Sequence, residues 1–266
     1  MTVPVPTEHI LQEIYNKAYH YDVHSLISVE KDWRSAKLMD YLTKTGELRG
    51  LNNVLEIGCM HGDFLRVMKN YGAQSITGVE PDRTAAENAK KAGAFHIHNM
   101  SVDEFLNSDK AKGCCFDLIV MSHVLEHIPN PNETLDRLKL LLGRQGQLLI
   151  LAPNAGALAP RVLKGTWGWW QTPVHLFHYT LHGLRLTLKK HKFEIKVAML
   201  RGADSLCILL SIRNLLSKLT PFLKCWQCEK NSVVFAGIIL RIWSAVFRYS
   251  LLLGDEEMVI LCRKGD

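Results

Sequence analysis

The feature that most constrains this chain is a short apolar strand pattern that contains an acidic residue and runs into a glycine-rich turn. The segment is VLEIGCMHG, Val54–Gly62, in which Glu56 precedes the turn and Gly58 and Gly62 bracket it. Glycine lets the backbone approach another group closely, because it has no Cβ atom. A turn between a parallel strand and the N-terminus of a helix is a usual ligand position in an α/β sheet.

Strand and helix patterns alternate after this turn, which is typical of βαβ units and a parallel sheet. We predict strands over residues 53–57, 75–79, 94–98, 116–121, 147–151, 193–200 and 258–262. Amphipathic helices are predicted over residues 62–71, 83–92, 132–142 and 181–191. The predicted fold class is therefore α/β, with a doubly wound, mostly parallel seven-stranded sheet.

Three regions follow from these patterns. Residues 1–50 read as an N-terminal helical cap, and residues 51–205 with 255–266 form the α/β domain. Residues 206–254 interrupt the domain before its last strand as an apolar helical insertion. At 266 residues the chain is long enough to bury a substantial core, and 47% hydrophobic residues are ordinary for a globular protein.

The insertion carries basic residues among its apolar runs. Arg241, Ser244 and Arg248 are spaced i, i+3 and i+7, so they form a polar stripe on an otherwise apolar helix. Such a stripe suits a helix that lies on a membrane surface. A cap helix over the site and a dimer interface are the alternatives that the pattern leaves open.

Charge and cysteine content limit the environment of the chain. The formal net charge is +6, which fits an anionic substrate, a membrane surface or nucleic acid without choosing among them. The basic residues are spread along the chain, so nucleic acid is not the expected partner. An odd number of cysteines, seven, suggests reduced thiols, and the first 30 residues show no apolar leader. We expect a cytoplasmic protein, with peripheral membrane contact through residues 206–254 as the open possibility.

A second acidic motif follows the next predicted strand. In GVEPD, Gly78–Asp82, Glu80 comes 24 residues after Glu56. A carboxylate at the end of a strand can accept hydrogen bonds from both hydroxyls of a ribose. The glycine spacing from Gly58 to Gly62 is G-x-x-x-G and differs from the dinucleotide fingerprint G-x-G-x-x-G, which disfavours a nicotinamide-dependent oxidoreductase.

Together with L-E-H at Leu125–His127, these motifs resemble those of the class I S-adenosylmethionine (SAM)-dependent methyltransferases of the small-molecule type. The resemblance covers about residues 50–200 and the last strand, Glu257–Arg263. It implies a Rossmann-like fold, SAM as the cofactor and methyl transfer as the reaction. The chain departs from the family at Met60, where the family has the middle glycine of E-x-G-x-G-x-G.

The resemblance also implies a set of cofactor-binding positions. Glu56 would lie near the methionine portion of SAM, Glu80 would bind the ribose and Pro81 would lie against the adenine. Ser101 stands where the family usually places an acid that contacts the adenine amino group. The full predicted set is Glu56, Gly58, Cys59, Gly62, Glu80, Pro81, Ser101, Val102 and Ser122.

Histidines follow the strand that ends at Ser122. His123 is expected at the carboxyl edge of the sheet, and His123 or His127 is the predicted general base for a hydroxyl acceptor. A purely structural role for His127 in the turn is the alternative. The letters H-x-x-E-H resemble an inverted zinc-peptidase motif, but Pro129 prevents the continuous helix that this motif requires. We therefore expect no metal site. Some quinone O-methyltransferases carry acids and a histidine in the similar segment, which leaves metal binding as the alternative.

The segment after the fifth strand, Ala152–Thr180, is rich in aromatic residues. Its tryptophans and histidines are Trp167, Trp169, Trp170, His175 and His178. Aromatic clusters form platforms for flat or sugar-like acceptors, and they also pack caps. The related enzymes carry a similar H-x-x-H-[FY]-[ST] run near the acceptor, so this side is where we expect the acceptor to enter.

The leading hypothesis is a SAM-dependent methyltransferase that methylates an oxygen of a small-molecule, sugar or glycolipid-like acceptor. Methylation of nitrogen or carbon stays open, because the acceptor is not readable from these motifs. The alternative is a catalytically inactive, membrane-associated binding module on the same scaffold. Met60, Ser101 and the apolar insertion motivate that alternative.

Overall fold

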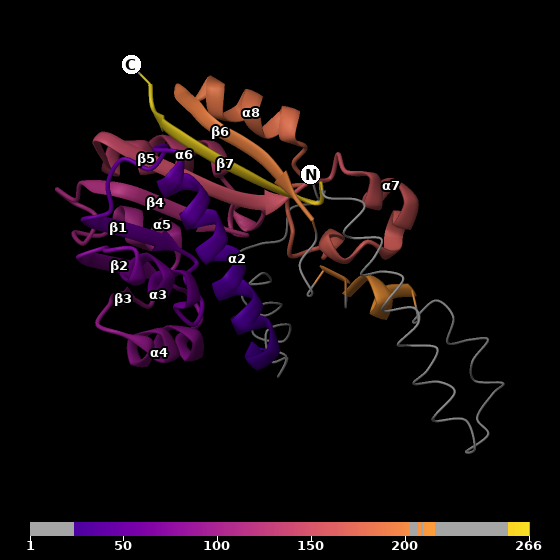
Figure 1. The fold of residues 1–266 in the computed structure, drawn as a ribbon, viewed down its shortest axis with the longest axis horizontal. Helices are drawn as coiled ribbons and strands as arrows, with labels where there is room; N and C mark the ends of the chain where they lie inside the picture. Colours follow the sequence, from indigo (N-terminus) through magenta and orange to yellow (C-terminus); the bar gives the residue numbers. More distant parts are fainter. Residues whose placement is uncertain (1–23, 203–206, 209, 216–254, 266) are drawn as a thin grey trace.

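The computed structural model describes residues 24–202, 207–208, 210–215 and 255–265, and these form an open α/β sheet covered by helices on both faces (Figure 1). The helix α2, His24–Lys44, falls within the predicted N-terminal cap. The polar stripe at Arg241, Ser244 and Arg248 lies outside the described residues, as does nearly all of the insertion that contains it. No helix in the described ranges is long and apolar enough to cross a membrane.

Within the described residues, seven strands pair in the order β3-β2-β1-β4-β5-β7-β6. The first five pair in parallel, and β7 runs antiparallel to both β5 and β6. Their bounds are β1 Asn53–Ile57, β2 Ser75–Val79, β3 His96–His98, β4 Phe116–Ser122, β5 Leu142–Pro153, β6 Phe193–Arg201 and β7 Glu257–Lys264. The predicted seven-stranded, mostly parallel sheet is therefore confirmed.

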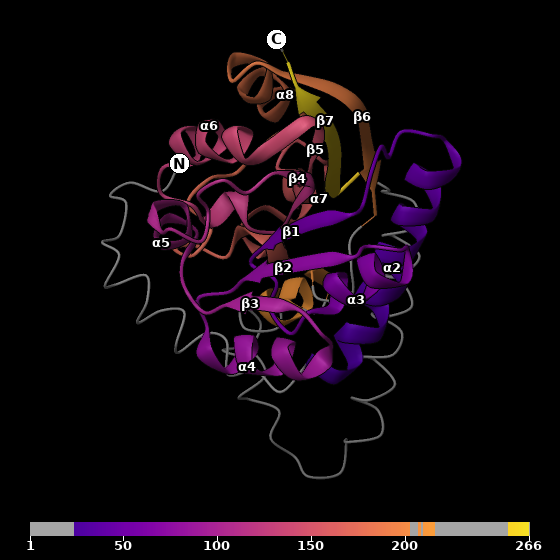
Figure 2. The same cartoon turned by 90° about the vertical axis from the view of Figure 1, so that its left-hand side faces the viewer.

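Helices form a layer on each face of this sheet, which is easiest to see along the strands (Figure 2). The helices α2 and α3 lie on one face, and α5, α6 and α8 lie on the other. Besides α2, the helices are α3 Asp63–Asn70, α4 Arg83–Ala92, α5 Val102–Asn107, α6 Pro131–Leu141, α7 Leu158–Leu163 and α8 Leu181–Lys190. Three 3-10 turns complete the elements, η1 Leu125–His127, η2 Lys164–Thr166 and η3 Gly168–Trp170.

Two apolar cores hold the layers together, because the central strands are buried on both sides. One core joins the sheet to α5, α6 and α8 through side chains such as Phe105, Leu135 and Leu184. The other joins the opposite face to α2, α3 and α4 through side chains such as Met39 and Leu65. A strand covered on both faces needs an almost continuous apolar run, which explains why these strands were readable from the sequence.

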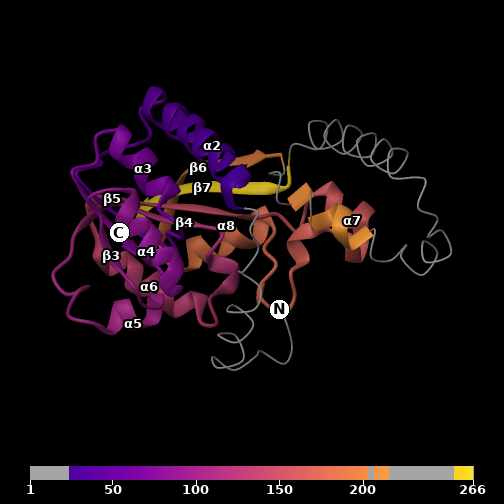
Figure 3. The same ribbon diagram turned by 90° about the horizontal axis from the view of Figure 1, so that it is seen from below.

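A smaller cluster lies beyond the carboxyl edge of the parallel strands. The segment after β5 carries α7 there, beside the helical residues 207–208 and 210–215 (Figure 3). Trp167, Trp169 and Cys207 are buried against one another in this cluster. The tryptophans Trp167 and Trp169 therefore pack the cap, which was one of the two alternatives considered for them.

The predicted elements differ from the structure at a few ends. The strand β3 begins two residues later than expected, and β5 is longer than predicted at both ends. The helix α5 was not predicted from the sequence. It begins with a capping box, in which the Ser101 hydroxyl accepts a hydrogen bond from the Glu104 N–H and the Glu104 carboxylate accepts one from the Ser101 N–H.

Gly78 on β2 is required by packing. A Cβ atom at this position would lie 2.7 Å from Cys59 Sγ and 2.8 Å from Ile97 Cδ1, and both side chains are buried. The turn after β1 can therefore lie directly against β2 only while residue 78 has no side chain.

We expect Gly78→Ala to lower the free energy of unfolding by about 1–3 kcal/mol, because an extra methyl group overpacks a closed core. Ser75→Ala at the exposed start of the same strand is the control, and it should change stability by no more than about 0.5 kcal/mol. Urea unfolding of both variants measures the difference. Equal unfolding midpoints for the two variants would show that the core beside β2 can accommodate a methyl group at residue 78, and would contradict this prediction.

Candidate cofactor and acceptor site

A cleft opens at the carboxyl ends of β1 and β4. Glu56, Gly58, Cys59, Ser122 and His123 are the predicted site residues that line it. The remaining wall residues were not predicted: Arg34, Ser35, Met60, Asp63, Phe64, Leu151, Arg201 and Glu257. This position matches the rule that ligands of open α/β sheets bind outside the carboxyl ends of the strands.

The turn after β1 is held tightly against β2. The backbone N–H groups of Gly58 and Cys59 donate to the Val79 carbonyl at 2.7 and 3.2 Å. Gly58 has a φ of +69°, and a Cβ atom there would lie 2.5 Å from Val124 Cγ2. Met60 also has a positive φ, +48°, which explains why related chains favour glycine at that position.

The side chains of this turn do not all face the cleft. The Cys59 thiol packs beside Gly78, and burial raises its pKa far above the ordinary range, so only its backbone can serve a ligand. A Cβ atom on Gly62, which precedes α3, would face Ala89 of α4. Gly62 therefore acts in helix packing, and the structure gives no direct cleft contact for it.

Glu80 is the best-oriented carboxylate of the site. Its Oε2 accepts a hydrogen bond of 2.8 Å from the Met60 N–H, and its Oε1 accepts one of 2.9 Å from the Asp82 N–H. The side chain is buried, and this burial raises its pKa to about 7, although the two backbone hydrogen bonds act in the opposite direction. The carboxylate thus links the turn after β1 to the turn after β2 in one fixed orientation.

The loop after β3 closes the far side of this region. The Asn99 side-chain amide donates to the carbonyls of Glu80 and Pro81, both at 2.9 Å. Pro81 is exposed beside it, whereas Val102 packs on the core below α5. The Ser101 hydroxyl is engaged in capping α5. Asn99 was missed by the sequence reading, and its place directly after a strand is the signal that could have found it.

Glu257, the first residue of β7, lines the cleft and contacts three cationic groups. Its carboxylate lies 2.8 Å from the Arg34 guanidinium, 2.7 Å from that of Arg201 and 2.9 Å from His123 Nε2. These charges hold the pKa of the buried Glu257 carboxyl far below its usual range, despite the opposing effect of burial. None of these four residues is near another in the sequence, so local patterns could not reveal the group.

His123 is held rigidly at the end of β4. Its backbone has a positive φ of +55°. The ring stacks on that of Trp169 with 4.8 Å between the ring centroids, and Nδ1 lies 3.6 Å from Glu126 Oε1. Burial alone would lower the pKa of His123, but the carboxylates of Glu126 and Glu257 raise it to about 10. His123 is therefore a cation near neutral pH, which argues against the predicted role of proton acceptor.

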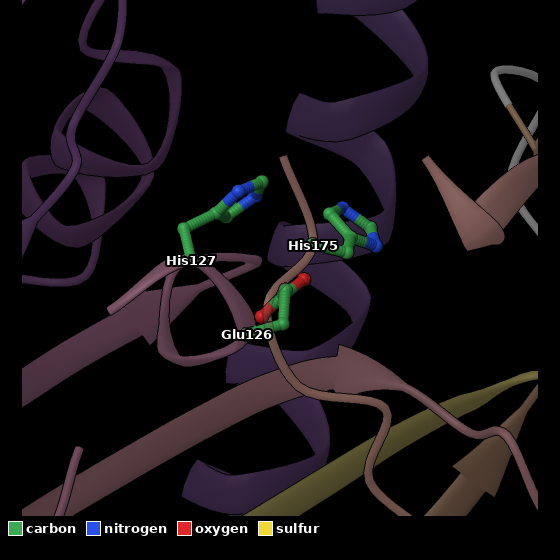
Figure 4. A group of neighbouring side chains, drawn as sticks. All are labelled: Glu126, His127 and His175. Atoms are coloured by element: carbon green, nitrogen blue, oxygen red, sulfur yellow. The ribbon is translucent and has the colours of Figure 1, made fainter. Parts of the chain in front are cut away.

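His127 lies next to a histidine from a distant segment. The rings of His127 and His175 pack edge to face with 4.6 Å between their centroids, and the Glu126 carboxylate lies beside them (Figure 4). His127 Nδ1 lies 3.1 Å from the Val174 carbonyl, and His175 Nδ1 lies 2.7 Å from the Trp169 carbonyl. Burial lowers the pKa of both imidazoles, that of His175 to about 3. Both rings are therefore neutral at pH 7.

This fold and site match a known family. Residues 31–196 match the family model described as a methyltransferase domain, which is more than half of the chain, so the chain belongs to this family. The result agrees with the class predicted from the motifs, the class I SAM-dependent methyltransferases with a Rossmann-like fold. SAM is the methyl donor of that class, in keeping with the predicted cofactor.

Individual relatives are similar over part of their length. A ubiquinone biosynthesis O-methyltransferase of Glaesserella parasuis is 33% identical over 122 residues, which are 44% of this chain and 51% of that one. A tRNA U34 carboxymethyltransferase of Pseudomonas aeruginosa is 29% identical over 131 residues, 47% of this chain and 39% of that one. The chain thus spans about half or less of the length of these curated relatives.

Solved structures share the fold at low sequence identity. A SAM-dependent methyltransferase from Archaeoglobus fulgidus superposes with a TM-score of 0.57 at 19% identity, covering 88% of this chain and 94% of that one. A magnesium protoporphyrin IX methyltransferase from Synechocystis, solved with bound S-adenosylhomocysteine, gives a TM-score of 0.53 at 18% identity, covering 75% and 94%. These likenesses establish the architecture.

Replacing Glu257 should test the ionic wall of the cleft. We expect Glu257→Gln to lower the free energy of unfolding by about 3–5 kcal/mol, because it leaves three partly buried cations without their counter-charge. Glu194→Gln removes an exposed partner of Lys196 and should lower the free energy of unfolding far less. Chemical unfolding of both variants gives the comparison. A loss for Glu257→Gln no larger than for Glu194→Gln would contradict a structural role of this ion-pair group.

Proposed function

We propose that this chain is a SAM-dependent methyltransferase that binds the cofactor across the carboxyl ends of β1 and β2 and methylates a small-molecule acceptor. The observation that carries the proposal is the orientation of Glu80. Its two carboxylate oxygens are fixed by the N–H groups of Met60 and Asp82, next to the turn at Gly58, which lines the cleft. A carboxylate held in this way suits the paired hydroxyls of a ribose.

The other residues of the cleft fit the remainder of this cofactor. Glu56 is a buried carboxylate on the cleft wall, beside the turn, where it suits an amino group. Outside the wall of the cleft, Asn99 fixes the loop beside Pro81, the residue expected to lie against the adenine. When bound, SAM supplies a methyl group on a positively charged sulfur. The side chains of the chain have to hold that group in line with an acceptor.

Positioning can supply much of the rate in such a transfer. Ser122 and His123 end β4 at the cleft, and the stacking of His123 on Trp169 limits its movement. Because these residues are held in place, they restrict where an acceptor atom can lie relative to the methyl group. Such orientation alone lowers the activation barrier of methyl transfer substantially. The proposal therefore does not depend on a dedicated base.

The acceptor is proposed to be a hydroxylated small molecule, including one that is linked to a lipid or a sugar. The similarity to a ubiquinone biosynthesis O-methyltransferase supports a small-molecule acceptor. The second candidate is an RNA nucleotide, which the similarity to a tRNA-modifying enzyme favours and with which the net charge of +6 is compatible. Methyl transfer from labelled SAM to a panel of phenols and to bulk tRNA separates the two. Label found in tRNA alone would overturn the small-molecule assignment.

Removing the Glu80 carboxylate should weaken cofactor binding. We expect isothermal titration of S-adenosylhomocysteine to give micromolar affinity for the wild type and a loss of about 1.5–3 kcal/mol for Glu80→Ala, the range for a hydrogen bond to a charged group. Glu87→Ala on the exposed side of α4 is the control and should bind like the wild type. An undetectable heat for all three proteins, each shown to be folded, would refute the proposed function.

The affinity for S-adenosylhomocysteine should also depend on pH through Glu80. Its pKa of about 7 in the free protein means that the carboxyl is mostly protonated at pH 6 and mostly ionised at pH 8. Binding needs the ionised form, so the dissociation constant should be roughly tenfold higher at pH 6 than at pH 8. In Glu80→Gln this pH dependence should disappear. A wild-type affinity that is constant between pH 6 and pH 8 would exclude Glu80 as the titrating contact.

A further inference from the structure

A cluster of three potential metal ligands, two buried and one partly buried, lies next to the cleft. Glu126 and His127 belong to η1, whereas His175 comes from the loop between η3 and α8. One donor atom from each side chain lies within 4.8 Å of the others. Figure 4 shows the carboxylate of Glu126 directed toward the space beside the two imidazole rings.

Backbone carbonyls determine which nitrogen of each imidazole carries the lone pair. A carbonyl oxygen can only accept, so the Nδ1–H of His127 donates to Val174 and the Nδ1–H of His175 donates to Trp169. The lone pair of each neutral ring is then on Nε2. Histidines that bind metals almost always donate their other N–H to a carbonyl or carboxylate in this manner.

The Glu126 carboxylate supplies an independent observation. The side chain is 1% exposed, and among the described residues neither of its oxygens accepts a hydrogen bond. The nearest cationic group recorded for it is His123 Nδ1 at 3.6 Å, which is beyond hydrogen-bond distance. A buried polar group without hydrogen bonds is costly, and such a group needs a specific explanation. The protonated His123 at 3.6 Å balances the charge of Glu126 without a hydrogen bond to it, and a bound cation would supply the missing direct contacts.

The backbone holds the two segments of the cluster together before any ligand arrives. The N–H groups of Leu176 and Phe177 donate to the Glu126 carbonyl at 2.8 and 3.1 Å. His175 is therefore placed against Glu126 by its own neighbours in the chain. In a tetrahedral zinc site, two ligand atoms lie about 3.4 Å apart. The three donors lie within 4.8 Å of one another, so the proposal requires them to move closer when an ion binds.

We propose that Glu126, His127 and His175 bind one divalent transition-metal ion of the zinc type. Two imidazoles and one carboxylate form a donor set known from zinc sites, and three protein ligands leave a fourth position for a water or for an oxygen of an acceptor. Imidazole ligands suit zinc, whereas magnesium prefers oxygen ligands and retains several waters. This proposal departs from the expectation, stated from the sequence, that no metal site is present.

Metal binding can be tested separately from methyl transfer. The full chain, stripped with a chelator and passed through a desalting column, is titrated with Zn²⁺, and with Co²⁺ as a spectroscopic probe. We expect one Zn²⁺ per chain, retained after desalting, and visible absorption bands of tetrahedral Co²⁺. An excess of Mg²⁺ should not displace either ion. Wild-type protein that retains clearly less than one Zn²⁺ per chain overturns the proposal.

Two variants locate the site. His175→Asn should weaken Zn²⁺ binding by at least 100-fold and abolish the Co²⁺ bands. His178→Asn, three residues along the same loop and outside the cluster, should keep both properties of the wild type. Zinc affinity that is equal in the two variants would place any bound metal elsewhere among the 12 histidines and overturn the assignment.

Folding of each variant is checked by circular dichroism and by titration with S-adenosylhomocysteine. If His175→Asn does not fold, Glu126→Gln replaces it, because glutamine keeps the shape of glutamate and removes the charge. Glu126→Gln that binds zinc like the wild type overturns the proposal. The failure of the proposed function would appear as absent S-adenosylhomocysteine binding, whereas the failure of this inference appears only in the metal measurements.

Discussion

The meeting of Arg34, Arg201 and His123 on the carboxylate of Glu257 links the elements that surround the cleft. Glu257 is buried, and a buried carboxylate without counter-charges would be strongly destabilising. Its partners come from α2, from the end of β6 and from the end of β4, so one side chain ties the N-terminal helix and the antiparallel edge to the parallel strands. The antiparallel insertion of β7 between β5 and β6 is what brings Glu257 to this position.

Burial alone would push every acid and histidine at this edge toward its neutral form, and the neighbours decide the outcome. His123 lies between two carboxylates and stays protonated, while His127 and His175 are neutral donors to backbone carbonyls. Glu80 has only backbone hydrogen-bond partners, and burial raises its pKa to about 7. The pKa of Glu126 is lowered to about 2 despite burial, chiefly because of its interaction with His123. The carboxyl edge of the sheet thus contains a cationic histidine, two neutral histidines and an ionised carboxylate close together.

The sequence by itself determined the elements whose cause is local. The strands β1 and β2 and the helix α4 have the predicted ends, because continuous apolar runs and 3.6-residue periodicity are written in neighbouring residues. The same holds for the turn at Gly58 and for the acid at Glu80, since each follows directly from a strand end. The family was also readable at this level. The role of Ser101 in cofactor binding stays a prediction, because a serine before a short helix caps it, as Ser101 does here, as readily as it contacts a ligand.

Only the tertiary structure decided which distant residues meet. Arg34 and Glu257 are separated by 223 positions, and His123 and Glu257 by 134. The pairing of His175 with Glu126 likewise depends on a loop that returns to η1 through backbone hydrogen bonds. No local pattern encodes such contacts, because they arise from strand order and from the path of connecting segments. For the same reason the charge of His123, which the sequence suggested as a base, became defined only when the fold placed two carboxylates beside it.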